Sequence, residues 1–154
     1  MMSLASDVLA ALRGRTLVTA ESITGGGIGA MLTSVPGASS VYKGGIISYC
    51  DDVKAFALGV DPEILRHVGA VSAPVAESMA LGVRKALQAD VAVSVTGLAG
   101  PDGDSYGNPV GTVFVGYSDA HRSFAREYHF SGTRSQIRES TIRTALELIL
   151  EINK

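Results

Sequence analysis

The run Asp90–Thr96, with the sequence DVAVSVT, constrains the fold more than any other stretch of the chain. Every second residue in it is a valine, and β-branched residues of this kind favour strands. A strand with so little polar character is typical of the middle of a sheet that is covered on both faces. The run therefore predicts a central strand with helices packed on each side of it.

The order of the remaining elements extends this prediction to the whole chain. Helices are expected at 3–13, 28–32, 53–58, 61–65, 73–88 and 133–152, and further strands at 16–20, 44–49, 110–117 and 122–130. Helices and strands in this order form layers around a sheet. We expect the α/β fold class, as a three-layer α/β/α sandwich with a mixed, mostly parallel sheet of about five strands. Residues 1–154 are expected to form a single domain.

The composition of the chain indicates which classes of partner and which cellular compartment to expect. The net charge of -2 gives no general attraction to nucleic acid or to an acidic membrane. The one cysteine, Cys50, excludes an intrachain disulfide and suits a reducing compartment. No apolar run approaches the roughly 18 residues of a membrane span, and the first residues lack the basic region of a secretory signal. We therefore expect a cytoplasmic protein without nucleic-acid or membrane partners.

A glycine-rich turn, Glu21–Gly27, joins the strand at 16–20 to the helix at 28–32. A strand, a turn and a helix in this order aim free backbone N–H groups at an anion. Three glycines also let a helix and a strand pack closely, so the pattern alone leaves both interpretations open. Ligands of open α/β sheets bind beyond the carboxyl ends of the strands. If the strands at 16–20, 44–49 and 91–96 are parallel neighbours, Ser22, Tyr49 and Thr96 line one rim.

The stretch Gly37–Lys54 carries three reactive groups close together in sequence. Ser39 and Ser40 precede the strand at 44–49, Tyr49 ends it, and Lys54 follows five residues later. Amide hydrolysis by a serine nucleophile with a lysine base needs such a set, and no metal. Lys54 acts as a base only if burial lowers its pKa, whereas the neighbouring acids Asp51 and Asp52 favour its charged form.

The cysteine and the histidines suggest two other kinds of site. Cys50 is a rival nucleophile, but a lone cysteine more often packs as a small hydrophobic residue. The three histidines, His67, His121 and His129, show no spacing that is typical of metal ligands. We expect neither a metal nor a cofactor.

Six sequence blocks carry a resemblance to a known family. They are Ala20–Gly26 (AESITGG), Gly37–Ser40 (GASS), Tyr49 with Lys54, His67–Ser72 (HVGAVS), Val95–Pro101 (VTGLAGP) and Pro109–Val113 (PVGTV). In this order and spacing the chain resembles the CinA C-terminal domain family, also known by the competence- or damage-inducible names, over residues 16–145. It is similar to stand-alone members of the PncC type, which are nicotinamide mononucleotide (NMN) deamidases.

The resemblance implies an amidohydrolase of pyridine nucleotide recycling. Such an enzyme converts NMN to nicotinic acid mononucleotide and ammonia, and relatives suggest a homodimer. The family pattern implies a serine nucleophile at Ser39, assisted by Tyr49 and Lys54. Residues expected to contact the nucleotide substrate are Glu21, Ser22, Thr24, Gly25, Gly26, Ser40, Thr96, Gly97 and Arg138.

The sequence departs from the family pattern at three places, and two other functions stay open. Ile23 stands where relatives often have cysteine, Asp51-Asp52 replaces an Asn-Glu pair, and Asn108 stands where relatives often have lysine. The first alternative is a non-catalytic nucleotide- or phosphate-binding domain that uses the same rim. A DNA-binding role is a weaker alternative, because the chain is slightly acidic and lacks a basic stripe.

Overall fold

The computed structural model describes all 154 residues and contains one five-stranded sheet. Its strands are β1 (Leu17–Glu21), β2 (Tyr42–Ile47), β3 (Val91–Gly97), β4 (Thr112–Ser118) and β5 (Ser123–His129), in the spatial order β2-β1-β3-β4-β5. β1 pairs in parallel with β2 and β3, whereas β4 is antiparallel to both β3 and β5. Four strands therefore point one way and β4 alone is reversed.

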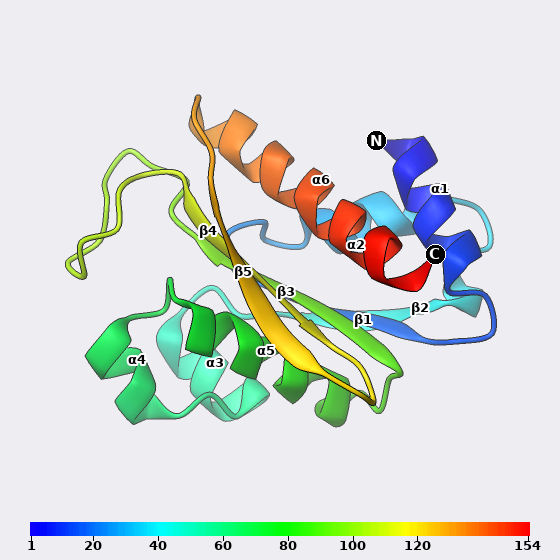
Figure 1. Ribbon diagram of the computed structural model, residues 1–154, viewed down its shortest axis with the longest axis horizontal. Coiled ribbons are helices and arrows are strands. Elements are labelled where there is room, and N and C mark those ends of the chain that lie inside the picture. The colour runs from blue at the N-terminus through cyan, green and yellow to red at the C-terminus, as the bar shows by residue number, and fades with distance from the viewer.

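Helices cover both faces of the sheet (Figure 1). One layer contains α1 (Met2–Ala11), α2 (Gly27–Thr33) and α6 (Arg134–Asn153), and the other contains α3 (Asp51–Leu58), α4 (Pro62–Val68) and α5 (Ala73–Ala86). A short 3-10 helix, η1 (Ala38–Ser40), precedes β2. The predicted α/β/α sandwich with a mixed, mostly parallel sheet is confirmed.

β3 is buried on both sides, as its sequence predicts. Val91, Val93 and Val95 belong to the larger core cluster, beneath α1 and α6. Ala92, between two of these valines, belongs to the second cluster, beneath α3, α4 and α5. Alternate residues of a strand face opposite sides of the sheet, so a strand between two helix layers needs small or apolar residues at almost every position.

Element boundaries shift by a few residues from those expected. β2 ends at Ile47, so Tyr49 lies just beyond the strand. α3 begins at Asp51, which places Lys54 within its first turns. α6 begins with a capping box in which the Thr133 side chain accepts from the Gln136 N–H and the Gln136 side chain accepts from the Thr133 N–H.

The topology gives the sheet two chemically different rims. The carboxyl ends of β1, β2 and β3 lie at one rim, where the chain continues into Ser22, Ser48 and Leu98. The other rim holds the segments that precede these strands, together with the turn between β4 and β5. No helix combines the length and apolar character that crossing a membrane requires.

Candidate active site

A pocket of about 290 Å³ opens at the carboxyl-end rim. Ser22 and Ile23 enter it from the end of β1, and Tyr49 and Lys54 from the segment after β2. The remaining lining residues come from the end of β3, the loop that follows it and neighbouring elements; they are Asp51, Ala70, Val71, Thr96, Gly97, Leu98, Ala99, Gly100, Asp102 and Arg134. The predicted rim of Ser22, Tyr49 and Thr96 is confirmed.

Lys54 and Ser22 form a buried amine–hydroxyl pair. Lys54 Nζ lies 3.0 Å from Ser22 Oγ and donates a hydrogen bond to the Ser48 carbonyl oxygen at 2.7 Å. Lys54 is 1% exposed and Ser22 7% exposed. No carboxylate forms an ion pair with Lys54. The amine is therefore held in place by two neutral oxygens.

Burial lowers the pKa of the Lys54 amine, because removal from water disfavours its charged form. The negative charge of Asp51 and the neighbouring Cys50 act in the opposite direction but are weaker causes. The expectation that Asp51 favours the charged form of Lys54 is confirmed, but burial has the larger effect on the pKa. The neutral amine is the form that accepts a proton.

Glu21 supports the turn that presents Ser22. The carboxylate is 2% exposed, and its Oε1 accepts from Thr24 Oγ1 at 2.6 Å and from the Ile28 N–H at 2.9 Å. Its Oε2 accepts from the Gly29 N–H at 3.0 Å. Glu21 thus satisfies free N–H groups at the start of α2. Glu21 and Thr24 do not line the pocket and bond within the turn and the start of α2, so their expected role as substrate ligands stays a prediction.

Arg138 braces the same turn from α6. Its Nε donates to the Ile23 carbonyl oxygen and its Nη2 to the Thr24 carbonyl oxygen, both at 3.1 Å. Gly25 and Gly26 have positive φ values of 58° and 103°, which glycine adopts without strain. None of these three residues lines the pocket. Their expected contacts with substrate stay a prediction, and the contacts that the structure shows for Arg138 are with the backbone of the turn.

Ser39 and Ser40 lie at the opposite rim. Both belong to η1, before β2 begins, whereas Tyr49 and Lys54 follow the end of β2. The six residues of β2 span about 20 Å at the rise of an extended strand. Ser40 Oγ is used locally and donates to the Gly37 carbonyl oxygen at 2.9 Å. The expected convergence of Ser39 with Tyr49 and Lys54 does not occur within one chain, and Ser22 occupies the position beside the amine instead.

The remaining predicted residues lie in the pocket. The Tyr49 hydroxyl accepts a hydrogen bond from Arg134 Nη2 at 3.1 Å. Thr96 Oγ1 donates to the Ala70 carbonyl oxygen at 3.0 Å. A Cβ atom at Gly97 would lie 2.7 Å from Val113 Cγ2 and 2.9 Å from the Thr112 carbonyl oxygen, which belongs to the backbone, so a larger residue would force a shift there. Tyr49, Thr96 and Gly97 are therefore brought together with Ser22 and Lys54, as expected.

Comparison with known proteins identifies the family of the chain. The model of the CinA C-terminal domain matches residues 1–152. The chain belongs to this family. A CinA-like protein of Thermosynechococcus vestitus is 46% identical over 140 residues, which are 89% of this chain and 34% of that protein. Another, from Synechocystis, is 52% identical over 109 residues, which are 71% of this chain and 26% of that protein. The chain thus spans about a third of the length of these CinA relatives, or less.

Solved CinA-family structures share the fold over most of their length. The competence/damage inducible protein CihA from Agrobacterium tumefaciens has a TM-score of 0.95 at 38% identity, covering 99% of this chain and 95% of that one. The competence damage-inducible protein A (ComA) from Klebsiella pneumoniae has a TM-score of 0.95 at 32% identity, covering 97% and 94%. The resemblance to the CinA C-terminal domain family, which rests on the six sequence blocks, is confirmed.

Arg134 is the main pocket residue of this CinA-family chain that sequence reasoning missed. It occupies the first position of α6 and reaches both Tyr49 and the Gly100 carbonyl oxygen. A cation is unfavourable at a helix N-terminus, where the helix dipole is positive. An arginine at that place, with no acidic residue in the first turn, was therefore a signal of a role outside the helix.

The buried amine predicts an unusual pH dependence of stability. The lowered pKa of Lys54 means that the unfolded chain binds this proton more tightly than the folded one. The contribution of Lys54 to the free energy of unfolding should therefore rise with pH, from the folded pKa up to the unfolded value of about 10.4. Lys54→Met should be more stable than the unmodified chain at pH 7, with a smaller difference at pH 9.5, in urea denaturation. Lys85→Met, at an exposed lysine, should show no such trend, and a constant difference for Lys54→Met would contradict the inference.

Proposed function

We propose that this CinA-family domain hydrolyses the carboxamide of NMN, giving nicotinic acid mononucleotide and ammonia. The observation that carries the proposal is the buried pair of Lys54 Nζ and Ser22 Oγ, 3.0 Å apart in an open pocket. A serine hydroxyl beside a neutral lysine amine is an activated nucleophile that needs neither histidine nor metal. Ser22 therefore replaces Ser39 as the proposed nucleophile.

The proposed reaction has two halves. Ser22 Oγ attacks the carboxamide carbon while Lys54 Nζ accepts the hydroxyl proton. Lys54 keeps one N–H on the Ser48 carbonyl oxygen, so the nitrogen lone pair is directed by a fixed contact. The collapsing intermediate expels ammonia, which takes the proton from Lys54, and leaves an ester on Ser22. Lys54 then deprotonates a water that hydrolyses this ester, and the proton returns to Ser22.

Main-chain N–H groups beside Ser22 supply the proposed oxyanion site. The N–H groups of Ile23 and Thr24 bond to no acceptor within the chain, whereas the N–H groups of Ser22 and Gly25 are already bonded. They directly follow the nucleophile in the turn between β1 and α2. The N–H after the nucleophile has the same role in the strand-to-helix turn of α/β-hydrolases. Preorganised donors of this kind stabilise the charge that develops on the carboxamide oxygen.

Charges around the pocket suit the two ends of NMN. The pyridinium ring of NMN is positive and its phosphate is negative. Asp51 and Asp102 supply carboxylates, and Arg134 supplies a guanidinium. The exposed Tyr49 ring offers an aromatic face to a cationic ring, and its hydroxyl is held by Arg134. We assign the phosphate to Arg134, in place of the expected Arg138.

The first test separates the two candidate nucleophiles. Ser22→Ala should lower kcat for ammonia release from NMN by about a thousandfold or more, because the attacking oxygen is lost. Ser39→Ala, at the far rim, is the matched control and should stay within about threefold of the unmodified chain. Loss of activity in Ser39→Ala alone would contradict Ser22. It would require Ser39 to be supplied by a second copy of the chain, in keeping with the expected homodimer.

The second test concerns the base. Lys54→Met should lower kcat by about 10²–10⁴-fold, the usual contribution of general base catalysis. In the unmodified chain, kcat/KM should rise with pH through the lowered Lys54 pKa, because only the neutral amine accepts the proton. Lys54→Arg should not restore activity, since a guanidinium stays protonated. NMN binding in calorimetry without any turnover by the unmodified chain would favour the non-catalytic alternative.

The third test concerns substrate recognition. Arg134→Gln should raise KM for NMN by about tenfold to a hundredfold, the usual range for losing a charge-assisted hydrogen bond. Nicotinamide riboside, which lacks the phosphate, should be hydrolysed about equally by Arg134→Gln and the unmodified chain. An equal loss on both substrates would show that Arg134 acts on the Tyr49 and Gly100 contacts instead of the phosphate.

A further inference from the structure

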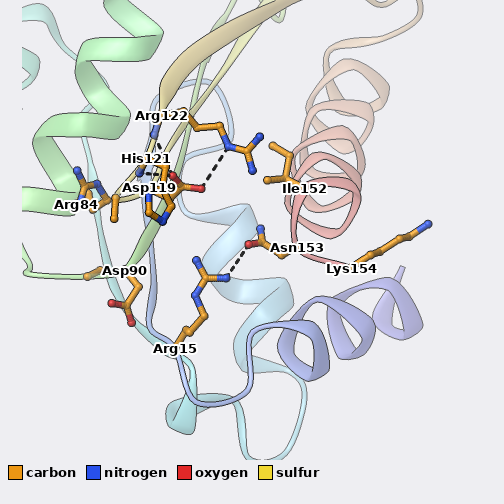
Figure 2. A pocket seen from close by; sticks show the side chains of 11 residues that line it. Arg15, Arg84, Asp90, Asp119, His121, Arg122, Ile152, Asn153 and Lys154 are labelled. Carbon is orange, nitrogen blue, oxygen red and sulfur yellow. Dashed lines mark hydrogen bonds and ion pairs between the residues drawn. The ribbon is translucent and has the colours of Figure 1, made fainter.

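A second pocket, of about 540 Å³, lies at the rim opposite the Ser22–Lys54 site. Arg15 enters it from the segment before β1, Arg84 from the last turn of α5, and Asn153 from the end of α6. The turn between β4 and β5 contributes Asp119 and Arg122 (Figure 2). None of these residues lines the proposed active site. The pocket therefore forms a separate chemical environment.

The two aspartates that line this second pocket, Asp90 and Asp119, already accept hydrogen bonds from the chain. Asp90 Oδ2 accepts from the Thr16 N–H at 2.8 Å and from Thr16 Oγ1 at 3.2 Å. Asp119 is 6% exposed; its Oδ2 accepts from the Tyr117 hydroxyl at 2.9 Å and its Oδ1 from the His121 and Arg122 N–H groups. Asp119 also pairs with the Arg122 guanidinium at 3.5 Å. Asp90 therefore stabilises the segment before β1, and Asp119 stabilises the turn between β4 and β5.

Two guanidinium groups remain without a negative partner. Arg15 Nη1 donates to Asn153 Oδ1 and Arg84 Nε donates to Ser118 Oγ, each at 2.9 Å and each to a neutral oxygen. Neither arginine belongs to any ion pair of the chain. Figure 2 shows Arg15 extending between the β4–β5 turn and the end of α6, while Lys154 points away. Each guanidinium keeps several unused N–H donors.

We propose that this second pocket binds a phosphate-bearing small molecule. Guanidinium groups donate in a fixed fork that matches phosphate oxygens. A phosphate monoester carries close to two negative charges at neutral pH, which balances Arg15 and Arg84, whereas a carboxylate carries one. The volume of the pocket falls within the usual range for small-ligand sites, roughly 300–1,000 Å³.

The proposed phosphate site is independent of the proposed hydrolysis. Arg15 lies before β1 and Ser22 lies after it, so the five residues of β1 separate the two sites by about 17 Å. A ligand held by Arg15 and Arg84 therefore does not contact the Ser22–Lys54 pair. The same molecule of protein is expected to bind NMN at one rim and a phosphate compound at the other.

Calorimetric titration of the full chain with pyrophosphate and, separately, with ADP tests the proposal. Each probe should bind the unmodified chain. Arg15→Gln and Arg84→Gln should each weaken the binding by about tenfold or more, the usual effect of losing a charge-assisted hydrogen bond. Arg143→Gln makes the same charge change at an exposed site on α6 and should bind as the unmodified chain does. Because Arg15 is exposed, its variant should keep the fold, which a thermal melt checks.

The outcomes separate the site from its alternatives. Tighter binding of ADP than of pyrophosphate supports a nucleotide ligand, and the reverse supports a free phosphate compound. Absence of binding by both probes overturns the proposal, and so does unchanged affinity in the Arg15→Gln/Arg84→Gln double variant. Binding that is lost in Arg134→Gln alone also overturns it, because the phosphate then occupies the other pocket. A chain that binds the probes through Arg15 and Arg84 but releases no ammonia from NMN would support this site and refute the proposed function.

Discussion

The contact between the buried Lys54 amine and Ser22 is the interaction on which the proposed chemistry depends. It exists because the β1–β2 ladder continues one residue past the end of β2: the Ser48 N–H donates to the carbonyl oxygen of Glu21, the last residue of β1, at 2.8 Å. Ser22 and Ser48 are thereby held side by side, and α3 returns Lys54 to the gap between them. Burial then favours the neutral amine. The pairing of the two backbones thus positions the oxygens that bind the Lys54 amine, and burial lowers the pKa of that amine.

The turn that carries Ser22 is fixed from two directions. Glu21 accepts hydrogen bonds from the start of α2, and these contacts offset the cost of burying a carboxylate. Arg138 donates to the following carbonyl groups from α6. Ser22 itself is left to face the pocket. Glu21 and Arg138 thus hold the turn through hydrogen bonds, and Ser22 keeps a fixed position in the pocket. Functional side chains in rigid scaffolds are held in this way by neighbouring residues.

The sequence predicts the fold well because its strongest signals are local. The valines of β3 indicate a doubly covered strand, and the strand ends lead to the rim of Ser22, Tyr49 and Thr96. The error at Ser39 has a geometric cause. Ser39 precedes β2 and Lys54 follows it, so closeness in sequence becomes separation across a strand. Likewise, the residue types of Glu21, Arg134 and Arg138 do not tell whether each binds the backbone or faces the pocket, because that depends on the packing of α2 and α6 against the turn.

The single reversed strand has a consequence for how this architecture diversifies. Because β4 runs opposite to β3, their connection is the loop 98–111 at the carboxyl-end rim, and no crossover helix is needed. This loop supplies Leu98 and Asp102 to the pocket and is tied to α4 through the Tyr106 hydroxyl, which donates to the Arg66 carbonyl oxygen at 2.8 Å. The serine and lysine belong to other segments. Changes in the length or charge of the loop can therefore alter which molecules enter the pocket, while the sheet and the Ser22–Lys54 pair stay as they are.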